Sequence, residues 1–141
     1  MSKLSLFKQN ELMLRDASKI LKYNELSREF GLTLTQKEAL MLIGVRAEEL
    51  KYHGRIEFGE GIFGKLIDAF CDSPYITQQS YFETLCALTE IFYYYKNETE
   101  EFLSDDELIW YMKKYFNGSC KGSTELLSTR EMDELARNIK R

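Results

Sequence analysis

Residues 81–95 read YFETLCALTEIFYYY and form the most apolar stretch of the chain. An α-helix turns about 100° per residue, so these large apolar side chains would cover more than half of a helix surface. The remaining narrow arc would carry Glu83, Ala87, Glu90 and Tyr94. A helix with so wide an apolar surface is normally enclosed by other elements. The stretch therefore predicts the central helix of an all-α fold, over about residues 73–96.

Helix starts can be read from side chains that are able to cap them. Residues 35–38 (TQKE) and 104–107 (SDDE) are capping boxes, in which two side chains bind the free backbone N–H groups of a helix start. Ser73 before Pro74 predicts the start of the central helix, because proline is tolerated at the first helical position. Ser128, with a glutamate three residues later, predicts the start of a last helix.

These signals predict a single domain over residues 1–141, with about six helices packed around the central one. The predicted helices cover residues 10–30, 35–53, 65–71, 73–96, 104–116 and 128 onward. Gly54 is expected to end the second helix in the left-handed conformation. The core face of the second helix is expected to carry Ala39, Leu40, Ile43, Ala47 and Leu50.

The composition limits the classes of function. The chain has 141 residues and a formal net charge of −4, which excludes a strongly basic nucleic-acid-binding protein. No stretch approaches the about 20 apolar residues of a membrane-spanning helix. Three cysteines without paired spacing, and no signal peptide, are typical of a reducing compartment. We therefore predict a cytoplasmic protein that binds neither nucleic acid nor membrane.

Residues 59–65 (GEGIFGK) match two phosphate-loop patterns, G-x-G-x-x-G and G-x-x-x-x-G-K. Such loops place backbone N–H groups around a phosphate at a helix start. Leu66, however, stands where the second pattern requires a hydroxyl for Mg²⁺, and the chain lacks the buried Val- and Ile-rich runs of a parallel sheet. We therefore predict a glycine-rich turn before a short helix, with no nucleotide or other cofactor.

Potential zinc ligands are present at Cys71, Cys86, Cys120 and His53. Structural zinc sites usually contain two cysteines separated by a few residues, and the chain has no such pair. Cys86 falls within the apolar surface of the central helix, where a free cysteine serves as a small hydrophobic residue. We predict no metal site and no cysteine nucleophile paired with His53.

Four blocks of the sequence are similar to those of a known family: residues 54–59 (GRIEFG), 70–76 (FCDSPYI), 92–99 (FYYYKNET) and 105–109 (DDELI). The chain resembles a family of short, uncharacterised proteins of clostridia-type bacteria, grouped as a domain of unknown function. The resemblance spans roughly residues 10–137. It implies a bacterial, cytoplasmic protein and brings no activity, cofactor or catalytic residue.

The sharpest candidates for a polar pocket are Arg55, Glu57, Asp72 and Glu90. The first three lie in segments that flank the glycine-rich loop, and Glu90 lies on the central helix. Such a group could do acid–base chemistry or bind a small ligand. The alternative is that the residues form buried ion pairs or helix caps. An enzyme or small-ligand binder that uses this pocket is the second functional hypothesis.

Acidic side chains are concentrated between residues 97 and 112, where no lysine or arginine occurs. The acidic residues are Glu98, Glu100, Glu101, Asp105, Asp106 and Glu107. The helix dipole favours anionic groups in the first turn of a helix by about 0.3–1 kcal/mol each. This effect would explain the acids at 105–107, and the alternative is a docking site for a basic partner.

Trp110 is the only tryptophan and falls on the outer face of the helix predicted over residues 104–116. Tyr94 falls on the outer arc of the central helix. A large exposed aromatic side chain contributes much binding energy when a partner covers it. The preferred hypothesis is a non-catalytic protein-interaction domain in which Trp110, with Tyr94, anchors a homodimer or an unknown protein partner. The alternative is that another helix packs over Trp110.

Overall fold

The computed structural model describes residues 3–99 and 102–139, and every regular element within those ranges is helical. The elements are, in order, α1 (Lys3–Lys22), α2 (Asn24–Ser27), η1 (Arg28–Phe30), α3 (Gln36–His53), α4 (Phe63–Phe70), α5 (Gln78–Glu98), α6 (Asp105–Asn117), α7 (Thr124–Leu126), η2 (Leu127–Glu131) and α8 (Met132–Ile139). Six of the α-helices in the described ranges have eight or more residues. The prediction of an all-α fold is confirmed.

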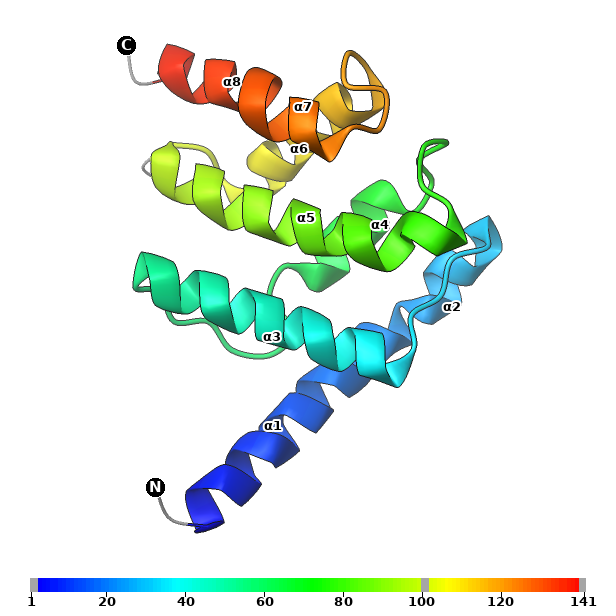
Figure 1. The fold of residues 1–141 in the computed structure, drawn as a ribbon, viewed down its shortest axis with the longest axis vertical. Helices are drawn as coiled ribbons and strands as arrows, with labels where there is room; N and C mark the ends of the chain where they lie inside the picture. The colour runs from blue at the N-terminus through cyan, green and yellow to red at the C-terminus, as the bar shows by residue number, and fades with distance from the viewer. Residues whose placement is uncertain (1–2, 100–101, 140–141) are drawn as a thin grey trace.

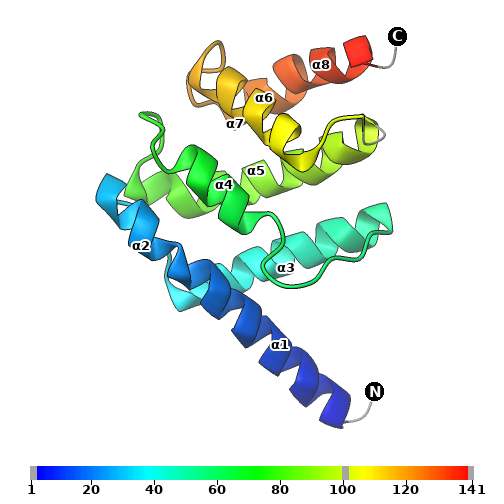
Figure 2. The same cartoon turned by 180° about the vertical axis from the view of Figure 1, so that it is seen from behind.

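α5 lies at the centre of the molecule, as its wide apolar surface predicts. It packs against α3, α4, α6 and α8, and Figure 1 shows α3, α5 and α8 side by side in one layer. Figure 2, seen from behind, shows α4 and α6 in a second layer across α5. α1 packs against α3 and runs obliquely away from the rest of the bundle. The α3–α5 pair and the α4–α6 pair therefore belong to different layers.

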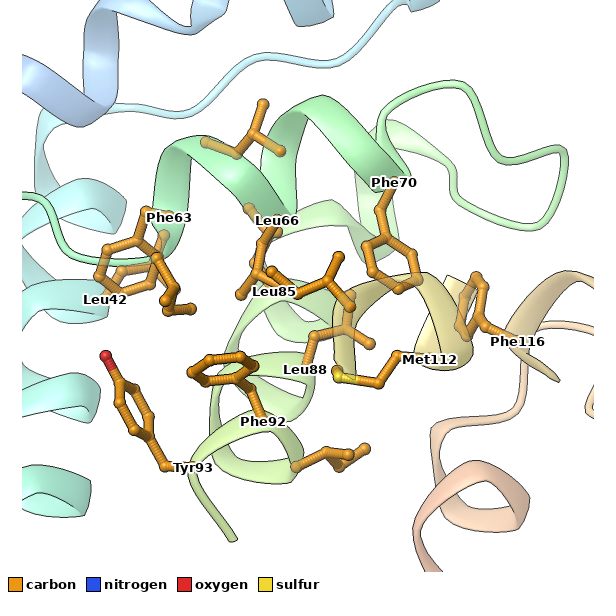
Figure 3. Close-up of a cluster of buried hydrophobic side chains, with 14 of the residues drawn as sticks. Leu42, Phe63, Leu66, Phe70, Leu85, Leu88, Phe92, Tyr93, Met112 and Phe116 are labelled. Atoms are coloured by element: carbon orange, nitrogen blue, oxygen red, sulfur yellow. The ribbon is translucent and has the colours of Figure 1, made fainter. Parts of the chain in front are cut away.

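The core is concentrated where α4, α5 and α6 meet (Figure 3). Its buried side chains include Phe63, Leu66 and Phe70 from α4, Leu85, Leu88 and Phe92 from α5, and Met112 and Phe116 from α6. The Phe70 and Phe116 rings meet edge to face with their centroids 5.4 Å apart, an arrangement that aromatic rings favour. Burial of each large side chain contributes about 1.5–3 kcal/mol. This cluster therefore holds the three helices in their relative positions.

Several of the predicted local signals are present. The Thr35 hydroxyl accepts a hydrogen bond from the Glu38 backbone N–H at 3.1 Å, and the Ser104 hydroxyl accepts one from the Glu107 N–H at 3.1 Å. In both capping boxes the glutamate carboxylate accepts the N–H of the capping residue in return. Gly54 ends α3 with φ of 65°, in the left-handed region. All of these predictions are confirmed.

The predicted start of α5 at Ser73 and Pro74 is wrong, because the helix begins after Thr77. The Thr77 hydroxyl accepts the Ser80 N–H at 3.3 Å, and the Ser80 hydroxyl accepts the Thr77 N–H at 3.1 Å. The Ser73 hydroxyl instead donates to Asn117 Oδ1, at the end of α6, over 2.6 Å. The same hydroxyl accepts the Tyr75 N–H at 3.3 Å, so Ser73 caps a turn that is joined to the end of α6 and does not start α5.

The last helical segment also begins earlier than predicted. The Ser123 hydroxyl accepts a backbone N–H at 3.1 Å and caps α7, and the helix continues through the π-helical η2 into α8. Ser128 lies inside η2, where its carbonyl accepts a hydrogen bond from the Tyr95 hydroxyl, so the predicted start at Ser128 is wrong. The first helix, predicted over residues 10–30, is divided after Lys22 into α1, α2 and η1.

The buried face of α3 differs from the predicted one. It carries Ala39, Leu42, Ile43, Arg46 and Leu50, whereas the predicted core residue Ala47 is exposed and Leu40 is half-buried. α3 packs against both α1 and α5, and the side of α3 that these two neighbours cover does not include Ala47. The error arises because periodicity shows which residues share a face but not which face a neighbour covers.

Candidate functional site

A groove of about 490 Å³ lies between the last turns of α3 and the second half of α5. Its lining consists of Glu48, Glu49, Tyr52 and His53 of α3, Glu90, Ile91 and Tyr94 of α5, and Ser128 of η2. A volume of this size falls within the range of about 300–1,000 Å³ that small-molecule sites occupy. We call this site the acidic groove.

The spacing of residues along the two helices explains how the acidic groove forms. Glu49 and His53 are four residues apart on α3, and Glu90 and Tyr94 are four residues apart on α5. Residues at this spacing project from one face of a helix. Because α3 and α5 lie side by side (Figure 1), the two pairs line the same groove.

The acidic groove carries a negative field. His53 Nε2 lies 3.4 Å from Glu49 Oε2, and the His53 side chain is only 6% exposed. Burial, and then the neighbouring Glu90 carboxylate, raise the pKa of Glu49 above its ordinary value, whereas His53 opposes the increase. The described residues that line the groove include three glutamates and no lysine or arginine. A cation that enters the groove would relieve the repulsion between Glu49 and Glu90.

Two tyrosines frame the acidic groove. Tyr52 is 82% exposed and Tyr94 is 45% exposed. The Tyr52 ring meets the His53 ring edge to face, with 5.0 Å between their centroids. The face of a tyrosine ring attracts a cation, in addition to any ion pair that the cation makes. Carboxylates and exposed rings together suit a lysine, an arginine or another organic cation.

The structure places the residues of the predicted polar pocket as follows, taking Arg55, Glu57, Asp72 and Glu90 in turn. Arg55 lies in the loop after α3, with its Nε buried. Glu57 accepts a hydrogen bond from the hydroxyl of buried Tyr93. Asp72 Oδ1 lies 3.3 Å from Lys113 Nζ of α6. Glu90 is the member of this set that lines the acidic groove.

Sequence reasoning gave no functional role to Glu49 and Tyr52 of the acidic groove, and it considered His53 only as a zinc ligand or as a base for a cysteine nucleophile. The four-residue spacing of Glu49 and His53 is visible in the sequence, but it does not show that this face of α3 meets the outer arc of α5. The two residues of α5 that the sequence singled out, Glu90 and Tyr94, do lie in the groove.

The acidic segment before and within α6 is largely paired inside the molecule. Asp105 Oδ1 lies 2.7 Å from Lys96 Nζ, and Asp106 Oδ1 lies 2.9 Å from Lys65 Nζ. Glu107 belongs to the capping box of α6. Glu100 and Glu101 lie outside the described residues. The paired and capping acids at 105–107 leave the acidic groove as the stronger candidate for binding a basic partner.

Two of the three glycines of the phosphate-loop pattern, Gly61 and Gly64, are closely packed. Gly61 has φ of 60°, and a Cβ atom there would lie 3.2 Å from Cδ of buried Arg46. A Cβ atom on Gly64 would lie 2.5 Å from Cζ of Tyr23. Both neighbours approach the backbone more closely than a larger residue permits. The glycine pattern therefore has a packing explanation.

The three cysteines are free. Burial raises the pKa of Cys86 to about 11, which keeps this thiol protonated and poorly nucleophilic at neutral pH. In the described part of the chain, no group of three or more His, Cys, Asp or Glu side chains is arranged to hold a metal ion.

Trp110 and Tyr94 line different hollows of the surface. Trp110 is 57% exposed and borders two hollows on the side of α4 and α6, of about 310 and 280 Å³. Tyr94 borders the acidic groove, and the described residues lining that groove include none that lines either hollow at Trp110. Trp110 and Tyr94 therefore belong to separate candidate surfaces.

Similarity to known proteins identifies the family. A family model matches residues 19–141 of the chain. The chain belongs to a family of unknown function, DUF6323. The DUF6323 region contains α3 and α5, and so the whole acidic groove. No curated protein and no solved structure matches the chain. Within residues 3–99 and 102–139, none of the helices combines the length and the apolar character needed to cross a membrane.

Proposed function

We propose that this protein is a non-catalytic protein-interaction domain, which binds a basic segment of a partner protein in the acidic groove. The observation that carries the proposal is the convergence of Glu49 and Glu90 from two helices, beside the exposed rings of Tyr52 and Tyr94. This arrangement matches the charge and the shape of a lysine or arginine side chain.

The expected energies favour a peptide segment over a free amine. A partly exposed ion pair contributes about 0.2–1 kcal/mol, and a cation–π contact contributes about 0.5–1 kcal/mol. One cation that meets two carboxylates and one ring would gain about 1–3 kcal/mol, whereas a millimolar Kd requires about 4 kcal/mol. Useful affinity therefore needs flanking contacts, which a basic segment supplies.

A small organic cation is the second candidate ligand. The volume of the acidic groove and the half-buried His53–Glu49 pair, with the raised pKa of Glu49, favour it. The second functional hypothesis, an enzyme or small-ligand binder, placed its pocket near Arg55, Glu57 and Asp72. The small-cation candidate keeps that hypothesis but places the ligand in the acidic groove between α3 and α5.

The proposed setting is the cytoplasm of a bacterium. The free state of all three cysteines supports a reducing compartment, and the resemblance of the sequence blocks described above supports a bacterial source.

The test is fluorescence anisotropy with a labelled peptide of alternating arginine and glycine, and with a matched peptide that has glutamine in place of arginine. We expect the arginine peptide to bind. Glu90→Gln should weaken binding of that peptide about two- to fivefold, because the variant loses one exposed ion pair. Glu29→Gln is the matched control, because Glu29 is exposed on η1, outside the lining of the groove, and the variant makes the same change in net charge.

Equal weakening by Glu90→Gln and Glu29→Gln would show that the peptide responds only to the net charge of the protein, and would refute the proposal. Equal binding of the glutamine peptide would refute it as well. If free agmatine competes as strongly as the arginine peptide, the small-cation candidate replaces the peptide segment.

A further inference from the structure

α6 exposes a row of residues whose charges are arranged symmetrically about Trp110. The row consists of Asp106, Glu107, Trp110, Lys113 and Lys114. Relative to Trp110 these residues lie at −4, −3, +3 and +4, which places them on the same face of the helix. Lys113 is half-buried and the other four are exposed. We call this surface the Trp110 face.

We propose that the Trp110 face binds the same face of a second copy of the chain, with the two α6 helices antiparallel about a two-fold axis at Trp110. In that arrangement the residues that follow Trp110 in one copy lie level with those that precede it in the other. The two-fold axis keeps each side chain on its own side of the contact, so position +3 faces position −4 and position +4 faces position −3. Lys113 therefore meets a second Asp106, Lys114 meets a second Glu107, and the two Trp110 rings meet at the centre. This contact goes beyond the proposed function and uses a different surface.

The charge pattern of the Trp110 face favours a second copy of the chain as the partner and an antiparallel orientation of the two helices. A parallel pairing in register would place lysine against lysine and carboxylate against carboxylate, which is unfavourable, whereas the antiparallel pairing opposes unlike charges and unlike helix ends. The acidic groove, with three glutamates and no lysine or arginine in its described lining, would repel a copy of itself.

The geometry around Trp110 also fits a self-contact. A hollow of about 310 Å³ beside Trp110 is lined by Asp106, Glu107 and Tyr111 as well, and it provides space for a side chain of the second copy. Lys114 Nζ lies 5.2 Å from the Trp110 ring centroid. The Lys65–Asp106 pair is exposed and the Lys113–Asp72 pair is partly exposed, and such pairs are weak, so Asp106 and Lys113 can exchange partners. One helix face is smaller than a standard interface, so the dimer should be weak and concentration-dependent.

The test is sedimentation equilibrium of the full chain over a range of concentrations. We expect Trp110→Ala to weaken self-association about tenfold or more, as loss of a central aromatic anchor does. Phe58→Ala is the matched control, since Phe58 is 89% exposed and lies in the loop between α3 and α4. Lys113→Glu with Lys114→Glu should also abolish the dimer, whereas Lys22→Glu with Lys37→Glu, at exposed positions of α1 and α3, should not.

Orientation is tested by cross-linking. We expect a mixture of Asp106→Cys and Lys113→Cys proteins to form the mixed disulfide dimer in preference to either homodimer, because only the antiparallel pairing places these positions opposite each other. A wild-type chain that is monomeric at every concentration would overturn the proposal. So would equal effects of Trp110→Ala and Phe58→Ala, or preferential cross-linking of Lys113→Cys with itself.

Discussion

Gly64 offers the sharpest test of why this chain has a glycine-rich turn. It lies buried in the first turn of α4, against the ring of Tyr23. A Cβ atom at this position would lie 2.5 Å from Cζ and 3.0 Å from Cε2 of that ring. Carbon atoms pack best at about 3.5–4.0 Å. Gly64→Ala therefore forces either the ring or the helix to move.

The size of the effect follows from two opposing contributions. Overpacking in a core costs about 1–3 kcal/mol, whereas alanine in place of glycine inside a helix gains about 0.5–1 kcal/mol. We expect Gly64→Ala to lower the free energy of unfolding by about 0.5–2 kcal/mol in the wild-type background. With Tyr23→Ala the clash is absent, and the same change should then be neutral or stabilising.

The assay is urea unfolding of the wild type, both single variants and the double variant. The expected coupling energy between the two sites is about 1–3 kcal/mol, the overpacking term alone. Gly44→Ala is the control, because no neighbouring atom lies within 4 Å of a Cβ at that helix position, and it should be stabilising. An equal effect of Gly64→Ala in both backgrounds would refute the packing explanation of this glycine.

Other predictions follow from single contacts. Tyr93→Phe removes the hydroxyl that binds Glu57 and should destabilise the fold by about 1.5–3 kcal/mol, as for hydrogen bonds to charged groups. Folding raises the pKa of Glu49, so the stability that protonated Glu49 contributes is lost as the pH rises through that pKa. Glu49→Gln, which keeps the side chain neutral, should therefore stabilise the fold by about 0.2–1 kcal/mol at neutral pH. Thr77→Ala should cost about 1 kcal/mol through loss of the cap of α5.

The midpoint of denaturant unfolding tests each of these three predictions. For Glu49→Gln it is measured over a range of pH. An unchanged midpoint for Tyr93→Phe would mean that the Glu57 contact contributes no net stability. A Glu49→Gln effect that grows as the pH falls would contradict the expected sign. If Thr77→Ala leaves stability unchanged, α5 starts before Thr77.

The parts of the fold that the sequence predicts correctly depend on contacts between neighbouring residues. The boxes at 35–38 and 104–107 are closed by hydrogen bonds over three positions, so the residues that decide them are adjacent in the sequence. At Ser73 and Ser128 the same type of signal does not start a helix, and distant residues fix both segments. The Ser73 hydroxyl accepts the Tyr75 N–H within a turn and donates to Asn117 of α6, while Ser128 lies inside η2, where its carbonyl accepts the hydroxyl of Tyr95.

The two candidate surfaces differ in the same respect: the Trp110 face depends on residues close together in the sequence, and the acidic groove depends on residues far apart. The charge pattern about Trp110 is a property of one helix, and its −4, −3, +3, +4 spacing can be read from the sequence alone. The acidic groove combines Glu49 and His53 with Glu90 and Tyr94, about 40 residues later in the chain. Helical periodicity defines each face of α3 and α5, but only the packing of α5 against α3, which follows from burial of the shared core, brings the two faces together.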